Sequence, residues 1–154
     1  ELVAELARRH QEWDFVLVGS TVSADVSVLR KLKNVALAGE RPYEELPDWL
    51  ARFDVAIIPF KRTPLTEATN PVKAYEMLAG RKPVVSVQIP EVAALAPLSR
   101  LASTLEEFEK EIAEALEFNY EPVIVERRLA FAKENTWPAR LNALRPKIDE
   151  LLQP

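Results

Sequence analysis

Two charged side chains stand one helical turn apart near the start of a predicted helix. Lys73 and Glu76 occur in the stretch Asn-Pro-Val-Lys-Ala-Tyr-Glu-Met-Leu-Ala-Gly, residues 70–80. A lysine offers a cation to a phosphate, and a carboxylate can accept hydrogen bonds from sugar hydroxyls. The first helical turn adds unpaired N–H groups and the positive end of the helix dipole, which favour an anion. The alternative is a solvent-exposed i,i+3 ion pair, which stabilises a helix by about 0.2–0.5 kcal/mol.

The same stretch predicts a capped helix, a glycine stop and a buried strand. Asn70 is expected at the N-cap and Pro71 in the first turn, where its missing N–H would have no partner. Gly80 is expected to end the helix in the left-handed conformation, and a valine-rich strand follows at 84–87. The apolar residues that recur at helical spacing predict the buried face: Val72, Tyr75, Leu78 and Ala79.

Composition excludes several classes of function. The 154 residues, 48% hydrophobic and 29% charged, are typical of one soluble globular domain. A net charge of −4 argues against a nucleic-acid binder that depends on phosphate contacts. The chain has no cysteine, which excludes disulfides, thiol nucleophiles and cysteine metal sites. It also has neither an apolar run long enough for a membrane span nor a signal-peptide pattern.

Scarce residue types exclude further sites. The three glycines, Gly19, Gly39 and Gly80, cannot form a G-x-G-x-x-G or Walker A loop. The single histidine, His10, excludes an H-E-x-x-H zinc site, and we interpret it as a solvated residue at a helix end. We therefore expect no metal, and no residue of the chain is identified as catalytic.

Strand patterns alternate with helix patterns along the whole chain. This alternation predicts an α/β fold with an open, doubly wound (Rossmann-like), mostly parallel sheet and helices on both faces. The segment 20–32 is expected to be polar and weakly helical, and the segment 61–69 to be a ligand-facing loop. The expected strands are 15–18, 35–38, 54–60, 84–87 and 101–102.

Four further helices are expected, at 1–13, 104–116, 123–133 and 136–152. Thr104 and Glu107 predict a capping box for the second of these. We interpret Arg127 and Arg128 in the third as solvated. The expected buried residues of the second and the last helix are Phe108, Ile112 and Leu116, and Leu141, Leu144, Ile148, Leu151 and Leu152.

The segment 70–85 resembles the nucleotide-binding segment of B-type glycosyltransferases, which consist of two Rossmann-like domains. Within them it is most similar to the retaining, glycogen-synthase-like group (glycosyltransferase group 1), whose usual wording is P-x-K-x-x-E-x-x-A-x-G-x-P-V-V. The resemblance runs from Glu1 to about Leu152. It implies that Glu76 bonds the ribose hydroxyls of the donor. The helix start would then bind the diphosphate through Asn70, Pro71, Val72 and Lys73.

A second segment, 39–50, resembles the family's G-x-x-P-x-x-x-L-P-x-x-L run, whose loop frames the nucleotide base. By that resemblance Arg41, Pro42 and the backbone around Tyr43 border the nucleobase. The alternative is that Arg41 is a surface cation and that Pro42 merely opens the next helix. Further candidate loop contacts are Gly19, Glu67 and Thr69, although the acid that many members carry eight residues before the glutamate is Ala68 here.

The family's second domain opens with a central strand and a glycine-containing loop, before the helix that matches residues 1–13. The chain lacks that strand, the arginine and lysine that many members direct at the diphosphate, and the N-terminal acceptor-binding domain. We therefore expect residues 1–154 to be a single nucleotide-sugar-binding domain of a larger two-domain enzyme, with 136–152 as its C-terminal helix, and to be inactive alone.

The resemblance implies the donor-binding half of a cytoplasmic glycosyltransferase of the bacterial cell-envelope or exopolysaccharide type. It would transfer a hexosyl group from a UDP-, GDP- or dTDP-sugar to a glycan or lipid-linked acceptor, without a cofactor. Any peripheral membrane contact would be made through the absent N-terminal domain. Two alternatives stay open: a sugar-nucleotide epimerase of the same architecture, and a non-catalytic α/β interaction domain.

Overall fold

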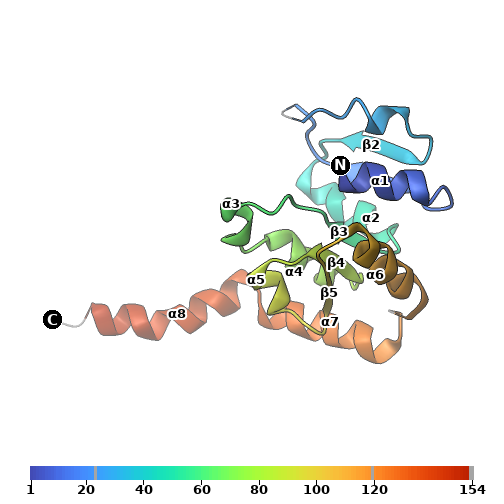
Figure 1. Cartoon of the computed structure of the whole chain (residues 1–154). Helices are drawn as coiled ribbons and strands as arrows, with labels where there is room; N and C mark the ends of the chain where they lie inside the picture. Colours follow the sequence, from blue (N-terminus) through green and yellow to red (C-terminus); the bar gives the residue numbers. More distant parts are fainter. Residues whose placement is uncertain (23, 119, 153–154) are drawn as a thin grey trace.

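The computed structural model describes residues 1–22, 24–118 and 120–152 (Figure 1). Its strands are β1 (Phe15–Val18), β2 (Val35–Gly39), β3 (Ala56–Ile58), β4 (Val84–Val87) and β5 (Ser99–Ala102). Its α-helices are α1 (Leu2–Arg9), α2 (Leu46–Ala51), α3 (Pro64–Glu67), α4 (Val72–Ala79), α5 (Pro90–Ala93), α6 (Leu105–Phe118), α7 (Pro122–Glu134) and α8 (Trp137–Leu151). Two short 3-10 helices, η1 (Leu29–Lys31) and η2 (Tyr43–Glu45), complete the described elements.

All of the strand pairs are parallel, so the predicted open α/β class is confirmed. The ladders form two sheets, one with the order β1-β2 and one with the order β3-β4-β5. Phe15 pairs with Val35 in the first, and Val84 lies between Ala56 and Ser99 in the second. Within the described chain, neither the free edge of β1 nor that of β3 has a ladder partner. The two sheets are therefore not joined by a ladder between β1 and β3 in the described residues.

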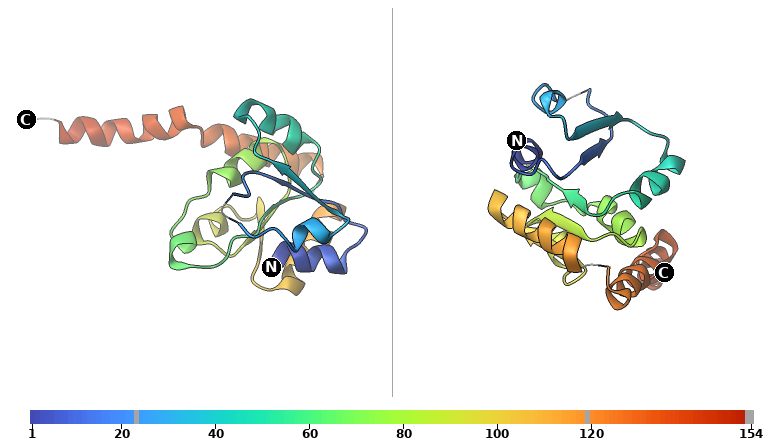
Figure 2. Two further views of the ribbon diagram at one scale, coloured as in Figure 1. Left: turned by 90° about the horizontal axis from the view of Figure 1, so that it is seen from above. Right: turned by 90° about the vertical axis from the view of Figure 1, so that its right-hand side faces the viewer.

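Helices cover both faces of the strands. Seen from the side, α1 and α6 lie on one face, and α2, α4 and α7 lie on the other (Figure 2). Every residue of β4 is buried, and its three valines form the centre of the core. Such a strand without hydrophobic alternation is typical of a parallel sheet that is covered on both faces.

The predicted α6 cap is confirmed, and its buried stripe is shifted by one residue. Thr104 Oγ1 accepts from Glu107 N at 3.1 Å, and Glu107 Oε2 accepts from Thr104 N at 3.3 Å. Phe108 and Ile112 are buried as expected, but the next buried residue is Ala115, whereas Leu116 is exposed.

The start of α4 differs from the prediction. Pro71, and not Asn70, occupies the N-cap position, with an extended backbone (φ −75°, ψ 106°) and no side-chain cap. Because the helix begins one residue later than predicted, Val72 is 49% exposed. The buried residues are Ala74 and Leu78, Tyr75 is half-buried against Phe131 of α7 (ring centroids 5.8 Å apart), and Ala79 is exposed.

The end of α4 also differs. Gly80 has an ordinary φ of −71°, and Arg81 adopts the left-handed conformation with φ 63°. Gly80 lies close to α2, since a Cβ there would lie 2.4 Å from Leu50 Cδ2 and that side chain would have to shift. The glycine thus permits a close approach of two helices, and an arginine accepts the unfavourable backbone.

Three segments contain less or more helix than predicted. The first helix ends at Arg9, and the described residues of the segment 20–32 are helical only in η1. The segment 61–69 contains α3, because the Thr63 and Thr66 side chains form a reciprocal cap at its start. Thr66 Oγ1 also donates to Lys61 O at 2.6 Å, so the cap fixes the connection after β3.

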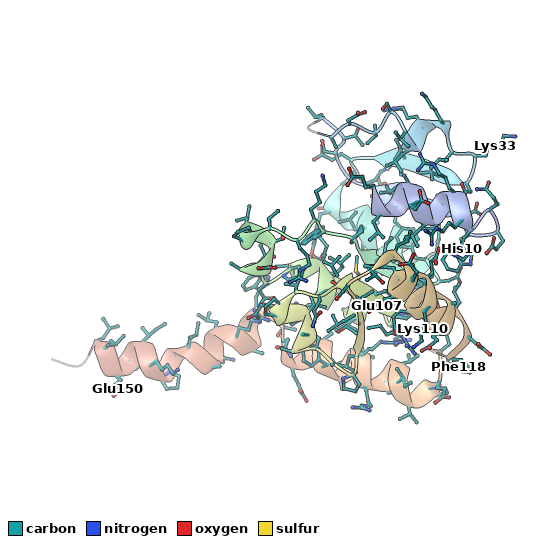
Figure 3. The ribbon with its side chains drawn as sticks, viewed as in Figure 1. His10, Lys33, Glu107, Lys110, Phe118 and Glu150 are labelled. Carbon is teal, nitrogen blue, oxygen red and sulfur yellow. The ribbon has the colours of Figure 1, made fainter. Side chains whose placement is uncertain are left out.

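His10 is not simply solvated. Its ring stacks on Trp13, with centroids 3.8 Å apart, and its Nε2 lies 3.3 Å from Glu109 Oε1 of α6. Figure 3 shows His10 beside α6, which also carries the labelled Glu107 and Lys110. Arg9 reaches Glu109 at 3.3 Å as well, so the end of α1 is held against α6 by polar contacts.

Two predictions for the C-terminal helices are wrong. Arg128 is only 1% exposed, and burial lowers its pKa, whereas Arg127 lies at the surface as expected. The helix α8 extends away from the rest of the chain, and Glu150 marks its distant part (Figure 3). Its predicted buried residues are consequently all exposed: Leu141, Leu144, Ile148, Leu151 and Leu152. Helical spacing identifies an apolar face but not what covers it.

The backbone of Arg81 generates a stability prediction. Replacing Arg81 with glycine relieves a left-handed L-residue, which costs about 1–2 kcal/mol relative to glycine. We expect Arg81→Gly to raise the free energy of unfolding in urea by about 1 kcal/mol, after the extra chain entropy of glycine is subtracted. The matched control, Arg81→Ala, keeps the strain and should leave stability unchanged. Equal stability of the two variants would contradict the assignment.

Asn34 generates a second stability prediction. Its buried Nδ2 donates to the carbonyls of Ala7, His10 and Trp13 at 3.0, 2.9 and 3.0 Å, which joins the end of α1 to the start of β2. Asn34→Ala removes these buried hydrogen bonds, although Ala7 O keeps Gln11 Nε2 as a donor and His10 O keeps Trp13 N, and it should cost about 1–3 kcal/mol in urea unfolding. The exposed neighbour Lys33 supplies the control, because Lys33→Ala should change stability little. A similar loss in both variants would exclude the amide as the cause.

Candidate functional site

The predicted site residues lie where the strands end. In a parallel sheet the carboxyl ends of all strands share one edge, and ligands bind in the loops beyond it. Gly19 and Gly39 end β1 and β2, and Gly19 N donates to Gly39 O at 2.9 Å. Both have a positive φ, 146° and 75°, so the two loops leave this edge through conformations that favour glycine.

The loop after β2 brings Tyr43 to α4. Pro42 stands at the N-cap of η2, and Tyr43 begins it with a side chain that is 67% exposed. The Tyr43 hydroxyl donates to Glu76 Oε1 at 2.9 Å. This hydrogen bond and the negative charge of Glu76 raise the pKa of Tyr43. The residue predicted to border the base therefore contacts the residue predicted to hold the ribose.

Arg41 points to a different neighbour. Its guanidinium carbon lies 5.1 Å from the centroid of the Trp49 ring of α2, and that of Arg52 lies 5.8 Å from the same ring. Cation–π contacts at exposed positions contribute about 0.5–1 kcal/mol. Arg41 is thus held against α2, on the same loop as Tyr43.

The start of α4 presents a cation and backbone donors together. Pro71 is buried, and no described side chain caps the first turn, which leaves the N–H groups of Val72 and Lys73 for solvent or an anion, while Ala74 N donates to Pro71 O at 2.9 Å. The exposed Lys73 places its Nζ 4.8 Å from the centroid of the Phe60 ring, just beyond β3. Lys73 and Glu76 are exposed and half-buried, respectively. They form no ion pair within the described residues.

The remaining candidates have partners inside the loop before α4. Glu67 Oε1 accepts from Arg62 at 3.0 Å, and the Thr69 hydroxyl donates to Thr66 O at 2.7 Å. Asn70 is exposed. The structure therefore brings Tyr43 and Glu76 into contact and engages Glu67 and Thr69 elsewhere. The ligand roles of all of these residues stay predictions.

Sequence reasoning missed the side chains that orient the site residues. It used only the backbone around Tyr43, and it named neither Phe60 beneath Lys73 nor Trp49 beneath Arg41. The sequence does show an aromatic residue directly after a strand, Phe60, and one early in a helix, Trp49. Which cation each aromatic ring contacts is decided by the fold.

Two features, a membrane-spanning helix and a cluster of metal ligands, do not occur among the residues that the structure describes. No helix in the described ranges combines the length and the apolar character needed to cross a bilayer. Over the same ranges, no three histidine, aspartate or glutamate side chains are grouped so that they could hold a metal ion.

Comparison with known proteins identifies the class. Residues 1–119 match the family model described as glycosyl transferases group 1. The chain belongs to this glycosyltransferase family, and the matched range contains every predicted site residue. It is also similar to a protein of Bacillus subtilis (strain 168) named "Putative teichuronic acid biosynthesis glycosyltransferase TuaH", with 34% identity over 93 residues. This match covers 58% of the chain and 23% of the length of that relative.

The contact between Tyr43 and Glu76 predicts a titration. The raised pKa means that the hydrogen bond is fully present below the ordinary tyrosine value of 10.0 and is lost as the pH rises through the raised value. Subtracting the tyrosinate absorbance of Tyr43→Phe from that of the wild type isolates this residue. In Glu76→Gln the pKa of Tyr43 should fall toward 10.0, because the charge is removed. The neighbouring Glu44→Gln is the control, and identical titrations in the wild type and Glu76→Gln would contradict the contact.

Proposed function

We propose that this chain forms the nucleotide-sugar donor site of a glycosyltransferase that transfers a hexosyl group to a glycan or lipid-linked acceptor. The observation that carries the proposal is the meeting of Tyr43 with Glu76 beside the open first turn of α4. It unites the loop assigned to the nucleobase with the helix assigned to the ribose and diphosphate. Membership of the family supports the reaction class.

The start of α4 suits the diphosphate. Its N–H groups and dipole favour negative charge, and Lys73 adds a cation one turn before Glu76. During transfer, negative charge develops on the departing nucleoside diphosphate. Donors that are already oriented stabilise such charge without reorganisation. In this proposal Asn70, Pro71 and Val72 contribute backbone and shape, while Lys73 contributes charge.

Glu76 suits the sugar of the nucleotide. A carboxylate accepts hydrogen bonds from two vicinal hydroxyls, and the ribose of UDP or GDP offers such a pair. The loop of Arg41, Pro42 and Tyr43 would border the base. Further loop contacts to the ligand would come from Gly19, Glu67 and Thr69. The proposal needs no metal and no cofactor, since the sugar nucleotide itself is the activated donor.

The similar protein in Bacillus subtilis is named for teichuronic acid biosynthesis. This similarity supports an envelope or exopolysaccharide acceptor for the complete protein. In our proposal the transfer takes place in the cytoplasm, where nucleotide sugars are made. A separate acceptor-binding domain would complete the active site.

Nucleotide binding to the complete protein tests the site. We expect Glu76→Ala to weaken binding of UDP or GDP about 10- to 100-fold in calorimetry, since hydrogen bonds to a charged group contribute about 1.5–3 kcal/mol. Binding of inorganic pyrophosphate should not change, because it has no ribose. The exposed Glu126 of α7 supplies the control, Glu126→Ala. Unchanged UDP and GDP affinity in Glu76→Ala would contradict the ribose assignment.

For Lys73 we expect the loss to be the same for both ligands. Lys73→Ala should weaken the binding of UDP and of pyrophosphate by the same factor, about 10-fold, because the lost charge-assisted contact is to phosphate in both ligands. Lys133→Ala on the exposed surface of α7 is the matched control. A loss for UDP without a loss for pyrophosphate would exclude Lys73 as a phosphate ligand.

A further inference from the structure

We infer that Tyr43 is a positioning residue for nucleotide binding, which holds the Glu76 carboxylate in place to receive the ribose hydroxyls of a nucleoside diphosphate. The inference rests on the proposed function and adds to it a side chain from the segment that follows β2. The ligand class is a ribonucleotide, because its sugar has the hydroxyl donors that a fixed carboxylate accepts.

The hydrogen bond uses only part of the carboxylate. Tyr43 donates to Oε1, and within the described residues no donor reaches Oε2. An ionised carboxylate offers about four acceptor positions, so a ligand can bind while Tyr43 stays in place. Tyr43 therefore fixes the direction of Glu76 without occupying its full capacity.

Without a partner, Glu76 would be free to rotate. Its side chain is half-buried on the surface of α4, and it makes no ion pair within the described part of the chain. Immobilising such a side chain on binding costs about 0.5–1.5 kcal/mol, which corresponds to about 2- to 10-fold in affinity. A hydrogen bond that already exists in the free protein removes part of that cost.

Tyr43 itself is well anchored. Its ring follows Pro42, whose restricted φ fixes the entry to η2, and Glu45 N donates to Pro42 O at 3.0 Å to close the turn. The next helix carries Leu50, which packs against Gly80 at the end of α4. The segment from Tyr43 to Leu50 thus contacts α4 at its middle, through Glu76, and at its C-terminal end, through Gly80.

The two residues also lie on segments that follow strands of different sheets. Tyr43 follows β2 of the two-stranded sheet, whereas Glu76 lies on the helix between β3 and β4 of the three-stranded sheet. A nucleotide whose base contacts the first loop and whose ribose contacts α4 must span both. The Tyr43–Glu76 hydrogen bond sets that span before the nucleotide arrives.

The test measures binding of UDP, GDP and pyrophosphate by the complete protein in four forms: wild type, Tyr43→Phe, Glu76→Ala and the double variant. Tyr43→Phe keeps the exposed ring and removes only the hydroxyl. We expect this substitution to weaken the binding of UDP and GDP about 3- to 10-fold and to leave the binding of pyrophosphate unchanged. In the Glu76→Ala background the same substitution should have no further effect, because its partner is absent.

A spectroscopic readout separates positioning from general loosening. In nucleotide-saturated protein, the tyrosinate absorbance of Tyr43 should still titrate above the ordinary value of 10.0, since the bond to Glu76 persists in the complex. Unchanged or tighter nucleotide binding in Tyr43→Phe, or an equal loss in the Glu76→Ala background, would overturn the inference. If instead the wild type bound neither UDP nor GDP, the proposed function would fail first and the inference with it.

Discussion

The parallel direction of the strands is the constraint on which the rest of this structure depends. Parallel strands cannot be joined by tight turns, so each one is followed by a segment that returns across a face of the sheet. Within each sheet every strand therefore ends at one edge, where the loops after β1, β2 and β3 begin. The segment after β2 carries Tyr43 and the helix after β3 carries Glu76, and the two side chains form a hydrogen bond although they lie far apart in sequence.

The elements of the fold were largely predictable from the sequence. A run such as Val84–Val87 is buried on both sides, so its strand needs little help from its neighbours to be recognised. The capping box of Thr104 and Glu107 is also local, and it formed as expected. Helix ends were less predictable, because the conformations of Pro71 and Arg81 depend on how α4 packs against α2 and α7.

The candidate site was predictable in its positions and not in its contacts. Resemblance in wording located Lys73 and Glu76 on one helix, but only the fold shows that the phenol of Tyr43 reaches Glu76 and that Phe60 lies beneath Lys73. The burial of a charged residue could not be predicted for the same reason. An arginine is expected at the surface, but α7 places Arg128 in the interior. The converse holds for α8, whose apolar residues were predicted to be buried and are exposed.

The division of the strands into two ladders has a mechanical consequence. No backbone hydrogen bond of either ladder crosses from β1 to β3 in the described chain, so the halves are joined by side chains and covalent connections. Contacts such as those of Arg9 and His10 with Glu109 join the halves on one face, and the Tyr43–Glu76 pair does so on the other. The two halves also share one hydrophobic core, in which Leu6 and Phe15 belong to the same cluster as Ile58 and Phe108. Their relative position is therefore set by side-chain packing and polar contacts and not by the hydrogen bonds of one continuous sheet.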